Sequence, residues 1–143
     1  MNFLFAFSGI LILLVTYVDF TYTTLSTSGS GIVSRLLTGS IWKVLFILSG
    51  GQGRRPLLSY AGIICTVVLI GSWITLIWIG NSLLFCAFPT SIRNGETRQI
   101  ASILEKFYFV GCTLSTVGFG DFYPTTRLWK IVSVLVGFSG LLS

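Results

Sequence analysis

The feature that most constrains the fold is an uncharged stretch of 32 residues, from Leu57 to Phe88. A helix needs about 20 apolar residues to cross a hydrocarbon core of roughly 30 Å. The stretch is longer than a straight crossing requires, and tilt or a final turn beyond the lipid takes up the excess. Pro89 marks its expected end. We therefore predict a membrane-spanning helix over residues 57–88.

Composition supports a membrane protein and argues against an enzyme. The chain is 53% hydrophobic and 9% charged, whereas soluble domains carry about 25% charged residues. Its net charge of +5 is scattered among apolar segments, which favours membrane lipid as a partner and not nucleic acid. With four acidic residues and no histidine, there is little material for acid–base chemistry or metal ligation, so we expect no cofactor. Three cysteines in apolar settings predict buried thiols rather than disulfides.

A second spanning helix is predicted near the N-terminus. The apolar run from Phe3 to Phe20 is about long enough to cross a bilayer. It lacks the positive start and the cleavage site of a signal peptide, so we expect it to be retained. Asp19, at its end, is expected in the headgroup zone. The Ser-, Thr- and Gly-rich segment Thr21–Gly31 predicts a loop or a helix entry.

The segment Ile32–Leu48 predicts a helix on the membrane surface, because Arg35 and Lys43 interrupt its apolar residues. A short re-entrant piece is the alternative. A Gly-rich break containing Arg54 and Arg55 follows it. Residues 1–56 therefore form an N-terminal part, distinct from residues 57–143.

Beyond the uncharged stretch, polar residues 89–99 predict an aqueous loop, and 100–115 a helix too short to span the bilayer. Such a half-length helix, followed by a Gly-rich loop, is typical of a re-entrant element. Glu105 and Lys106 are expected in a solvated turn at its start, and Trp73, Trp78 and Trp129 in contact with lipid or with the membrane interface. A last helix is predicted over 126–143. Its 16-residue apolar run, 128–143, covers only about 24 Å, so we expect it to be cut short.

The loop between these two helices reads Thr116-Val117-Gly118-Phe119-Gly120-Asp121. Unpaired carbonyls at membrane depth cost several kcal/mol each, but they become useful if they line a narrow axis that holds a cation. Successive carbonyls face one side only if alternate residues take left-handed backbone angles, which glycine tolerates. Gly118 and Gly120 occupy those alternate positions. Val117 and Phe119 would then pack behind the carbonyls, and the Thr116 hydroxyl adds one more oxygen.

Residues Leu104–Gly140 resemble the pore region of potassium channels. The resemblance implies an all-α membrane protein, a tetrameric potassium-channel-like pore domain with an extra N-terminal transmembrane helix. Residues 57–143 would form the pore domain, with an outer helix (57–88), a turret (89–99), a re-entrant pore helix (100–115), a selectivity-filter loop (116–120) and an inner helix (126–143).

The same resemblance implies a potassium-selective channel of the plasma membrane, passive and homotetrameric. The ion would be K⁺, bound by Thr116, Val117, Gly118 and Phe119, with Gly120 at the outer end of the filter. Asp121, Cys112 and Tyr123 would flank the filter. A weakly selective cation channel and a non-conducting membrane assembly module remain the alternatives.

Three departures from the family pattern concern the filter. Phe119 stands where tyrosine is commonest, so one hydrogen bond is lost, and Cys112 stands where some members carry a glutamate that bonds the flanking aspartate. Asp121 then has to bond water or a neighbouring aromatic residue. The third departure is that tryptophans are missing from the pore helix.

Gly137 and Gly140 occupy positions of a gating hinge or of close helix packing. No gating domain is visible in the sequence, which leaves two alternatives: a regulatory domain or subunit that is not in this chain, or a gate formed by the filter itself.

Overall fold

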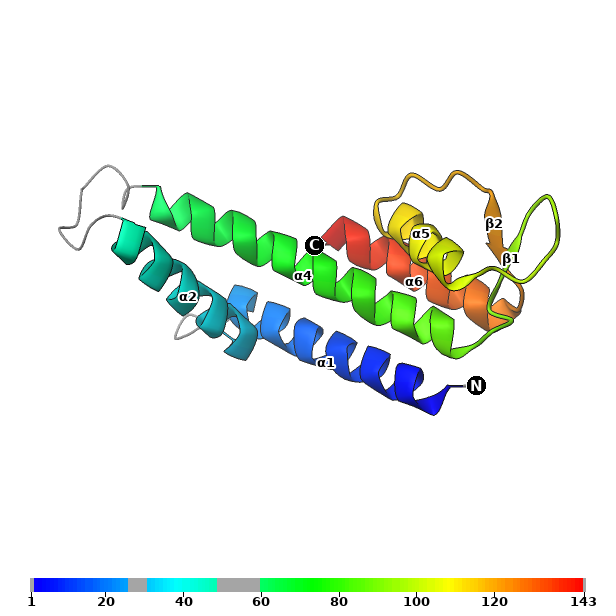
Figure 1. The fold of residues 1–143 in the computed structure, drawn as a ribbon, viewed down its shortest axis with the longest axis horizontal. Coiled ribbons are helices and arrows are strands. Elements are labelled where there is room, and N and C mark those ends of the chain that lie inside the picture. The colour runs from blue at the N-terminus through cyan, green and yellow to red at the C-terminus, as the bar shows by residue number, and fades with distance from the viewer. Residues whose placement is uncertain (1, 26–30, 49–59, 143) are drawn as a thin grey trace. The chain divides into compact units, whose positions relative to one another are not determined.

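The computed structural model describes residues 2–25, 31–48 and 60–142 and consists mostly of helices (Figure 1). Its elements are α1 (Phe3–Leu25), α2 (Ile32–Leu48), α4 (Ala61–Ala87), β1 (Ile92–Asn94), α5 (Ile103–Leu114), β2 (Phe122–Pro124) and α6 (Arg127–Leu142). The predicted helical class is confirmed. The break with Arg54 and Arg55, and the first three residues of the predicted outer helix, lie outside the described residues.

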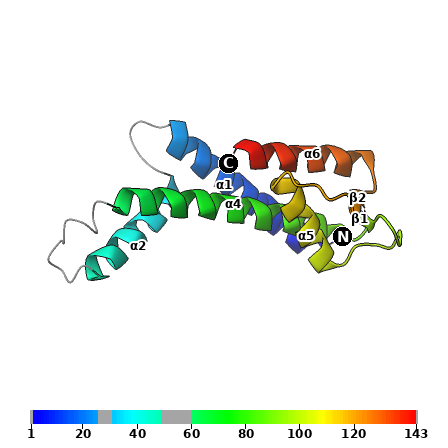
Figure 2. The ribbon, with the colours of Figure 1, turned by 90° about the horizontal axis from the view of Figure 1, so that it is seen from above.

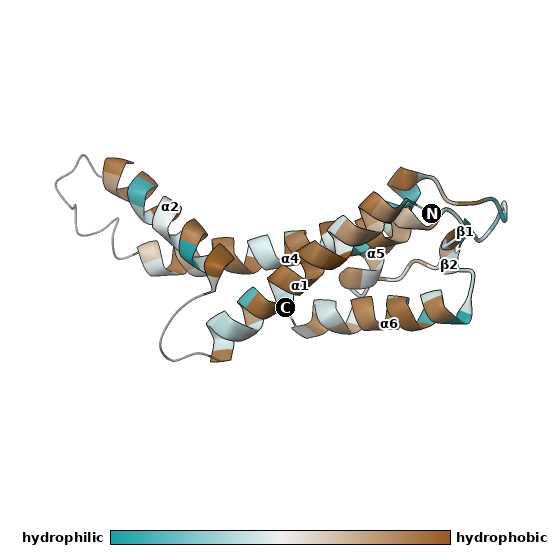
Figure 3. Cartoon of the chain, turned by 90° about the horizontal axis from the view of Figure 1, so that it is seen from below, coloured by the Kyte–Doolittle hydropathy of each residue, from teal (hydrophilic) through white to brown (hydrophobic). Residues whose placement is uncertain are grey.

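Two helices, α1 and α4, are long and apolar enough to cross a membrane, and both are predominantly hydrophobic in Figure 3. Helix α1 continues five residues beyond the predicted run, to Leu25. Two of its threonines bond within the helix, because Thr21 Oγ1 donates to the Tyr17 carbonyl and Thr24 Oγ1 to the Phe20 carbonyl, each at 2.7 Å. The polar residues that predicted a loop are therefore compatible with a helical end.

Helix α5 begins at Ile103, three residues later than predicted, because Ser102 forms its N-cap. The Ser102 hydroxyl accepts from the Glu105 amide at 3.4 Å, and the Glu105 carboxylate accepts from the Ser102 amide at 2.6 Å. This is a capping box, which stabilises a helix start. Its hydrogen bonds from the Ser102 amide and hydroxyl lower the pKa of the Glu105 carboxyl. Ile100 instead forms a β-bridge with Arg93.

A two-stranded antiparallel ribbon, which the sequence analysis did not predict, joins the segment before α5 to the segment after the Gly-rich loop. In it, Ile92 pairs with Pro124, Arg93 with Tyr123, and Asn94 with Phe122. The strands are three residues long, too short for an alternating pattern to be visible in the sequence. Figure 2 shows the ribbon beside α5, within the same unit.

The described residues fall into two compact units, one formed by residues 1–14 with 74–143 and the other by residues 15–73. The first unit has a core formed by buried side chains of α4, β1, α5, α6 and the segment before α5, namely Ile77, Phe85, Ile92, Ala101, Val110, Leu114 and Val136. Trp129 is half-buried and packs on Phe85, with ring centroids 4.7 Å apart, so protein covers part of this ring. In the same unit, a Cβ on Gly9 would lie 2.8 Å from the Gly80 carbonyl oxygen, so these glycines let α1 and α4 approach closely.

Lys106 fixes α5 to the end of α4 within this unit. Its side chain is 3% exposed, and its Nζ donates to the carbonyls of Phe85, Phe88 and Pro89 at 3.3, 2.8 and 3.0 Å. A cation at the C-terminal end of a helix satisfies carbonyls that have no intrahelical partner. The prediction of a solvated turn at Lys106 is therefore wrong, because the ammonium replaces water with three carbonyls.

The second unit is organised around the carboxylate of Asp19, which is 3% exposed. Oδ1 accepts from the Val33 amide at 2.8 Å, and Oδ2 accepts from the Ser34 hydroxyl at 2.6 Å and from Trp73 Nε1 at 3.1 Å. Asp19 thus caps the free amides at the start of α2 and binds α4 through Trp73. The sequence predicted that Asp19 lies in the headgroup zone and that Trp73 contacts lipid or the membrane interface. Both predictions are wrong, because both side chains face protein. Gly31 has no room for a Cβ beside this carboxylate.

Replacing Lys106 with methionine is expected to destabilise the protein by about 2–3 kcal/mol, because three carbonyls, one of them buried, lose a charged donor. The matched control is Lys130→Met, at an exposed lysine of α6, where the change should stay within about 0.5 kcal/mol. Thermal unfolding of the purified protein in detergent measures both. Equal stability of the two variants would contradict the role of Lys106.

Asp19→Asn is expected to lower stability by about 1–3 kcal/mol, because an amide group supplies one acceptor oxygen in place of two. Limited proteolysis should then cut α2 more rapidly than in the unchanged protein. Ser40→Ala is the control, since the Ser40 hydroxyl is exposed and bonds only its own helix, at the Leu36 carbonyl. A proteolysis pattern identical in both variants would show that α2 does not depend on Asp19.

Candidate functional site

The Gly-rich loop starts on the last turn of α5 and is tied to it by backbone hydrogen bonds. The amides of Val117 and Gly118 both donate to the Cys112 carbonyl, at 3.1 and 3.3 Å, and the Thr116 amide donates to the Thr113 carbonyl at 3.1 Å. The chain therefore reverses at Thr116 and returns along α5. Residues 116–118 have a fixed position relative to the helix.

Backbone angles in the loop follow the predicted alternation at its glycines. Gly118 has φ 54° and Gly120 has φ 81°, both left-handed. Thr116 was not predicted to be left-handed, yet its φ is 60°. A β-branched residue in this region carries strain of roughly 1–3 kcal/mol, which is typical of functional loops. The two glycines adopt the same region at little cost.

The end of the loop that carries Asp121 is held by Gly95, which precedes α5, and by Tyr108, which lies within α5. The Asp121 carbonyl accepts from the Gly95 amide at 2.7 Å, and the Asp121 carboxylate accepts from the Tyr108 hydroxyl at 3.4 Å. Hydrogen bonding to the Cys112 side chain, with desolvation and the Asp121 charge, raises the pKa of Tyr108, so the hydroxyl remains a donor. Asp121 thus bonds a neighbouring aromatic residue, one of the two partners expected from the sequence.

The three predicted flanking residues are only partly brought together. Tyr108, Cys112 and Asp121 lie around a small cavity of about 150 Å³ between α5 and the loop, together with Phe119 and Gly120. Tyr123 belongs instead to β2, where it pairs with Arg93. Tyr123 is therefore part of the ribbon.

Two side chains of the loop are exposed in the single chain. Val117 is 55% exposed and Phe119 is 65% exposed, so their packing behind the carbonyls stays a prediction for an assembly. The neighbouring cavity leaves Phe119 without a close packing surface on α5. An exposed phenylalanine and valine on a functional loop are side chains that another surface would cover.

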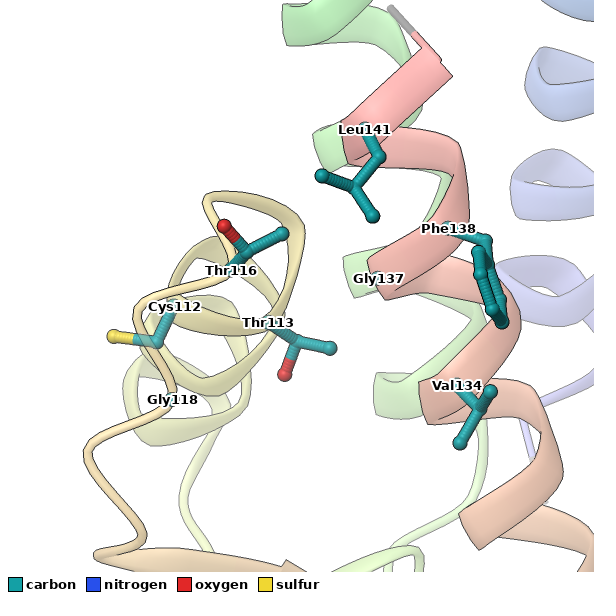
Figure 4. Close-up of a pocket in the computed structure, with 8 residues that line it drawn as sticks. All are labelled: Cys112, Thr113, Thr116, Gly118, Val134, Gly137, Phe138 and Leu141. Carbon is teal, nitrogen blue, oxygen red and sulfur yellow. The ribbon is translucent and has the colours of Figure 1, made fainter.

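A hollow of about 340 Å³ lies between the inner end of the loop and α6 (Figure 4). Thr113 and Thr116 line it from the loop side, and Val134, Phe138 and Leu141 from α6. Two threonine side chains thus face a largely apolar helix. The sequence analysis identified Thr116 but missed Thr113, whose hydroxyl donates to the Phe109 carbonyl at 2.8 Å.

The two candidate hinge glycines differ in their surroundings. A Cβ on Gly140 would overlap the Leu114 carbonyl, whereas one on Gly137 would lie 3.7 Å from the Thr113 carbonyl oxygen, an ordinary contact. Gly140 therefore allows α6 to lie directly on the end of α5, the close-packing role that the sequence left open. Gly137 carries no such requirement and stays a candidate hinge.

Trp78 joins α4 to α5 and was missed as a site residue. Its Nε1 donates to the Phe107 carbonyl at 3.0 Å, and its ring meets Phe107 edge to face at 5.8 Å. Gly111 leaves room for the indole, because a Cβ there would lie 3.3 Å from Trp78 Nε1. The prediction of a lipid contact captures only the exposed part of this ring.

Comparison with known proteins agrees with this geometry. Residues 63–143 match a family described as ion channel. The whole chain is 33% identical over 144 aligned positions to the uncharacterized membrane protein YdjJ of Bacillus subtilis, of whose length it spans 42%. No solved structure matches the chain. The family match covers α4, the ribbon, α5, the Gly-rich loop and α6, so the chain is a membrane protein that belongs to the ion channel family.

Proposed function

We propose that this chain is one subunit of a potassium-selective channel that conducts K⁺ passively across the plasma membrane. The observation that carries the proposal is the pair of left-handed glycines, Gly118 and Gly120, directly after a helix of 12 residues. That helix is too short to span a bilayer. A non-helical backbone following it is tolerated at membrane depth only where it is buried in protein or lines a water-filled path.

The mechanism follows from the carbonyl groups of the loop. In the proposal, carbonyls of Thr116, Val117, Gly118 and Phe119 replace the water of a dehydrated K⁺, with Gly120 at the outer end. Repulsion between ions in successive sites moves them along. The C-terminal end of α5 carries partial negative charge and stabilises a cation near Thr116. No step needs a covalent intermediate or a cofactor, so K⁺ enters the scheme only as the permeant ion.

One chain supplies one strand of carbonyls, which cannot surround an ion, so the proposal requires four copies around an axis. The exposed side chains of Val117, Phe119 and Phe138 support this assembly, because neighbouring copies would cover them. We propose that membrane lipid surrounds the homotetramer and that the Gly120–Asp121 end faces the outside. A regulatory domain or subunit beyond this segment would supply the gating stimulus.

A weakly selective cation channel is the second candidate, and the region behind Phe119 favours it. Phe119 has no hydroxyl, and a cavity of about 150 Å³ separates it from α5. A filter strand without a hydrogen bond at this point has one restraint fewer, worth about 1 kcal/mol. The two candidates differ in how strongly the pore distinguishes K⁺ from Na⁺.

Flux from liposomes that contain the purified protein tests the proposal. We expect K⁺ efflux that Ba²⁺ blocks and a reversal potential that follows the K⁺ gradient in the presence of Na⁺, because the carbonyl ring matches the larger ion. Native mass spectrometry of the same sample should show four chains. Equal K⁺ and Na⁺ flux would favour the weakly selective channel, and a confirmed absence of tetramers together with absent flux would refute the channel.

Gly118→Ala is expected to reduce K⁺-selective flux by more than about tenfold, because a left-handed alanine costs roughly 1–2 kcal/mol in each subunit. A Cβ at this position has open space around it, so the effect comes from the backbone angle and not from a clash. Gly62→Ala is the control, since Gly62 lies in α4, also with open space. Normal flux through Gly118→Ala would show that the left-handed angle is dispensable.

A further inference from the structure

The outer half of the Gly-rich loop has little support from α5. Hydrogen bonds to the Cys112 and Thr113 carbonyls hold residues 116–118. Within the described part of the chain, no hydrogen bond holds Phe119 or Gly120. The cavity of about 150 Å³ lies between these two residues and α5. The position of the outer carbonyls therefore depends on where Asp121 is held.

Asp121 is held by the ribbon of β1 and β2. The Gly95 amide donates to its carbonyl at 2.7 Å, the shortest backbone bond outside the regular elements of the described residues. At the other end of the ribbon, the Thr125 amide donates to the Ser91 carbonyl at 3.1 Å, and Thr125 Oγ1 to the Thr90 carbonyl at 2.6 Å. Residues 121–125 are thus tied along their whole length to the segment that precedes α5.

The β1 side of the ribbon is anchored in the protein core. Ile92 and Ser91 are fully buried, and the Ser91 hydroxyl donates to the Phe85 carbonyl of α4 at 2.8 Å. The Ile92 carbonyl accepts from the Ala101 amide at 3.1 Å. Strand β1 therefore connects α4, the start of α5 and Asp121. These bonds fix the position of Asp121 relative to the core.

The turn after β1 orients the Gly95 amide. Asn94 Oδ1 accepts from the amides of Glu96 and Thr97, at 2.9 and 3.1 Å, and the Asn94 carbonyl accepts from the Arg98 amide at 3.1 Å. These bonds leave the Gly95 amide free to face the loop. A Cβ on Gly95 would lie 3.1 Å from the Asp121 carbonyl oxygen, so glycine permits the close approach.

We propose that Gly95 is a positioning residue for ion discrimination: its amide, presented by the β1–β2 ribbon, fixes the outer end of the carbonyl row. This inference rests on the proposed function for its effect on ions, while its structural content concerns the loop alone. A restraint that fixes the spacing of flexible carbonyls affects which cation they coordinate. The coupling is reciprocal, so a cation bound by the loop also strengthens the Gly95–Asp121 bond.

Gly95→Pro tests the proposal, because proline removes the amide hydrogen while the turn tolerates it. Gly95 follows extended Asn94 and occupies the second position of a turn, both of which accept proline. Gly95→Ala is the matched control, since alanine keeps the amide donor and adds the same Cβ that proline adds, 3.1 Å from the Asp121 carbonyl oxygen. We expect Gly95→Pro to lower the K⁺/Na⁺ permeability ratio at least about fivefold more than Gly95→Ala does, because only proline removes the donor.

Hydrogen exchange of the full chain in detergent is the second readout and does not require conduction. Peptides that cover 119–121 should exchange more rapidly in Gly95→Pro than in Gly95→Ala, while α2 peptides exchange equally in both. Unchanged exchange at 119–121, or an unchanged permeability ratio in a conducting Gly95→Pro tetramer, would overturn the proposal. If the unchanged protein does not distinguish K⁺ from Na⁺, the proposed function fails, and exchange alone then decides the positioning role.

Asn94→Ala covers the case in which Gly95→Pro does not assemble. It removes the side-chain acceptor for the Glu96 and Thr97 amides but keeps every backbone group of the ribbon. The same two readouts should change in the same direction and by a smaller factor. An Asn94→Ala tetramer with the exchange rates and permeability ratio of the unchanged protein would contradict the role of the ribbon in positioning Asp121.

Discussion

The structure depends on finding hydrogen-bond partners for the few residues that leave helical geometry between α5 and α6. Backbone amides and carbonyls in such a segment are costly unless something pairs with them. Here the Cys112 carbonyl accepts from the amides of Val117 and Gly118, and the Gly95 amide donates to the Asp121 carbonyl. The carbonyls between these two anchors are the ones that would coordinate K⁺ in the proposed function. Helix packing, the ribbon and the capping of α5 all serve to keep those two anchors in place.

Buried charges provide the rigidity that apolar helices do not provide by themselves. Side chains of Leu and Ile distinguish poorly between neighbouring helices in lipid, because lipid tails are equally apolar. Lys106 and Asp19 do distinguish, since each needs a specific set of partners: three carbonyls for the ammonium, and amide, hydroxyl and indole donors for the carboxylate. Each residue lies in a different compact unit, so each unit has its own buried charge with specific hydrogen-bond partners.

Much of this fold was predictable from the sequence, and the misses have physical causes. Long apolar runs predicted α1 and α4, and the glycines predicted the left-handed angles at positions 118 and 120. The ribbon was missed because three-residue strands leave no periodic pattern. Lys106 and Asp19 were assigned to water or headgroups, since the partners of a buried charge lie far away in sequence. The Ser102–Glu105 capping box was a visible signal that could have placed the start of α5.

The ribbon has a consequence for how this region could be exchanged between proteins. The Thr125 hydroxyl donates to the Thr90 carbonyl at 2.6 Å. Residues 90 and 125 therefore lie side by side, and the chain between them forms a closed loop. Segments whose two ends lie together are the ones that domain insertion and grafting tolerate best. Apart from α4 and α6, every element that positions the Gly-rich loop lies between residues 90 and 125. Residues 90–125 thus form a unit for exchange, and the boundaries of a chimaera belong at residues 90 and 125 rather than at the helix ends.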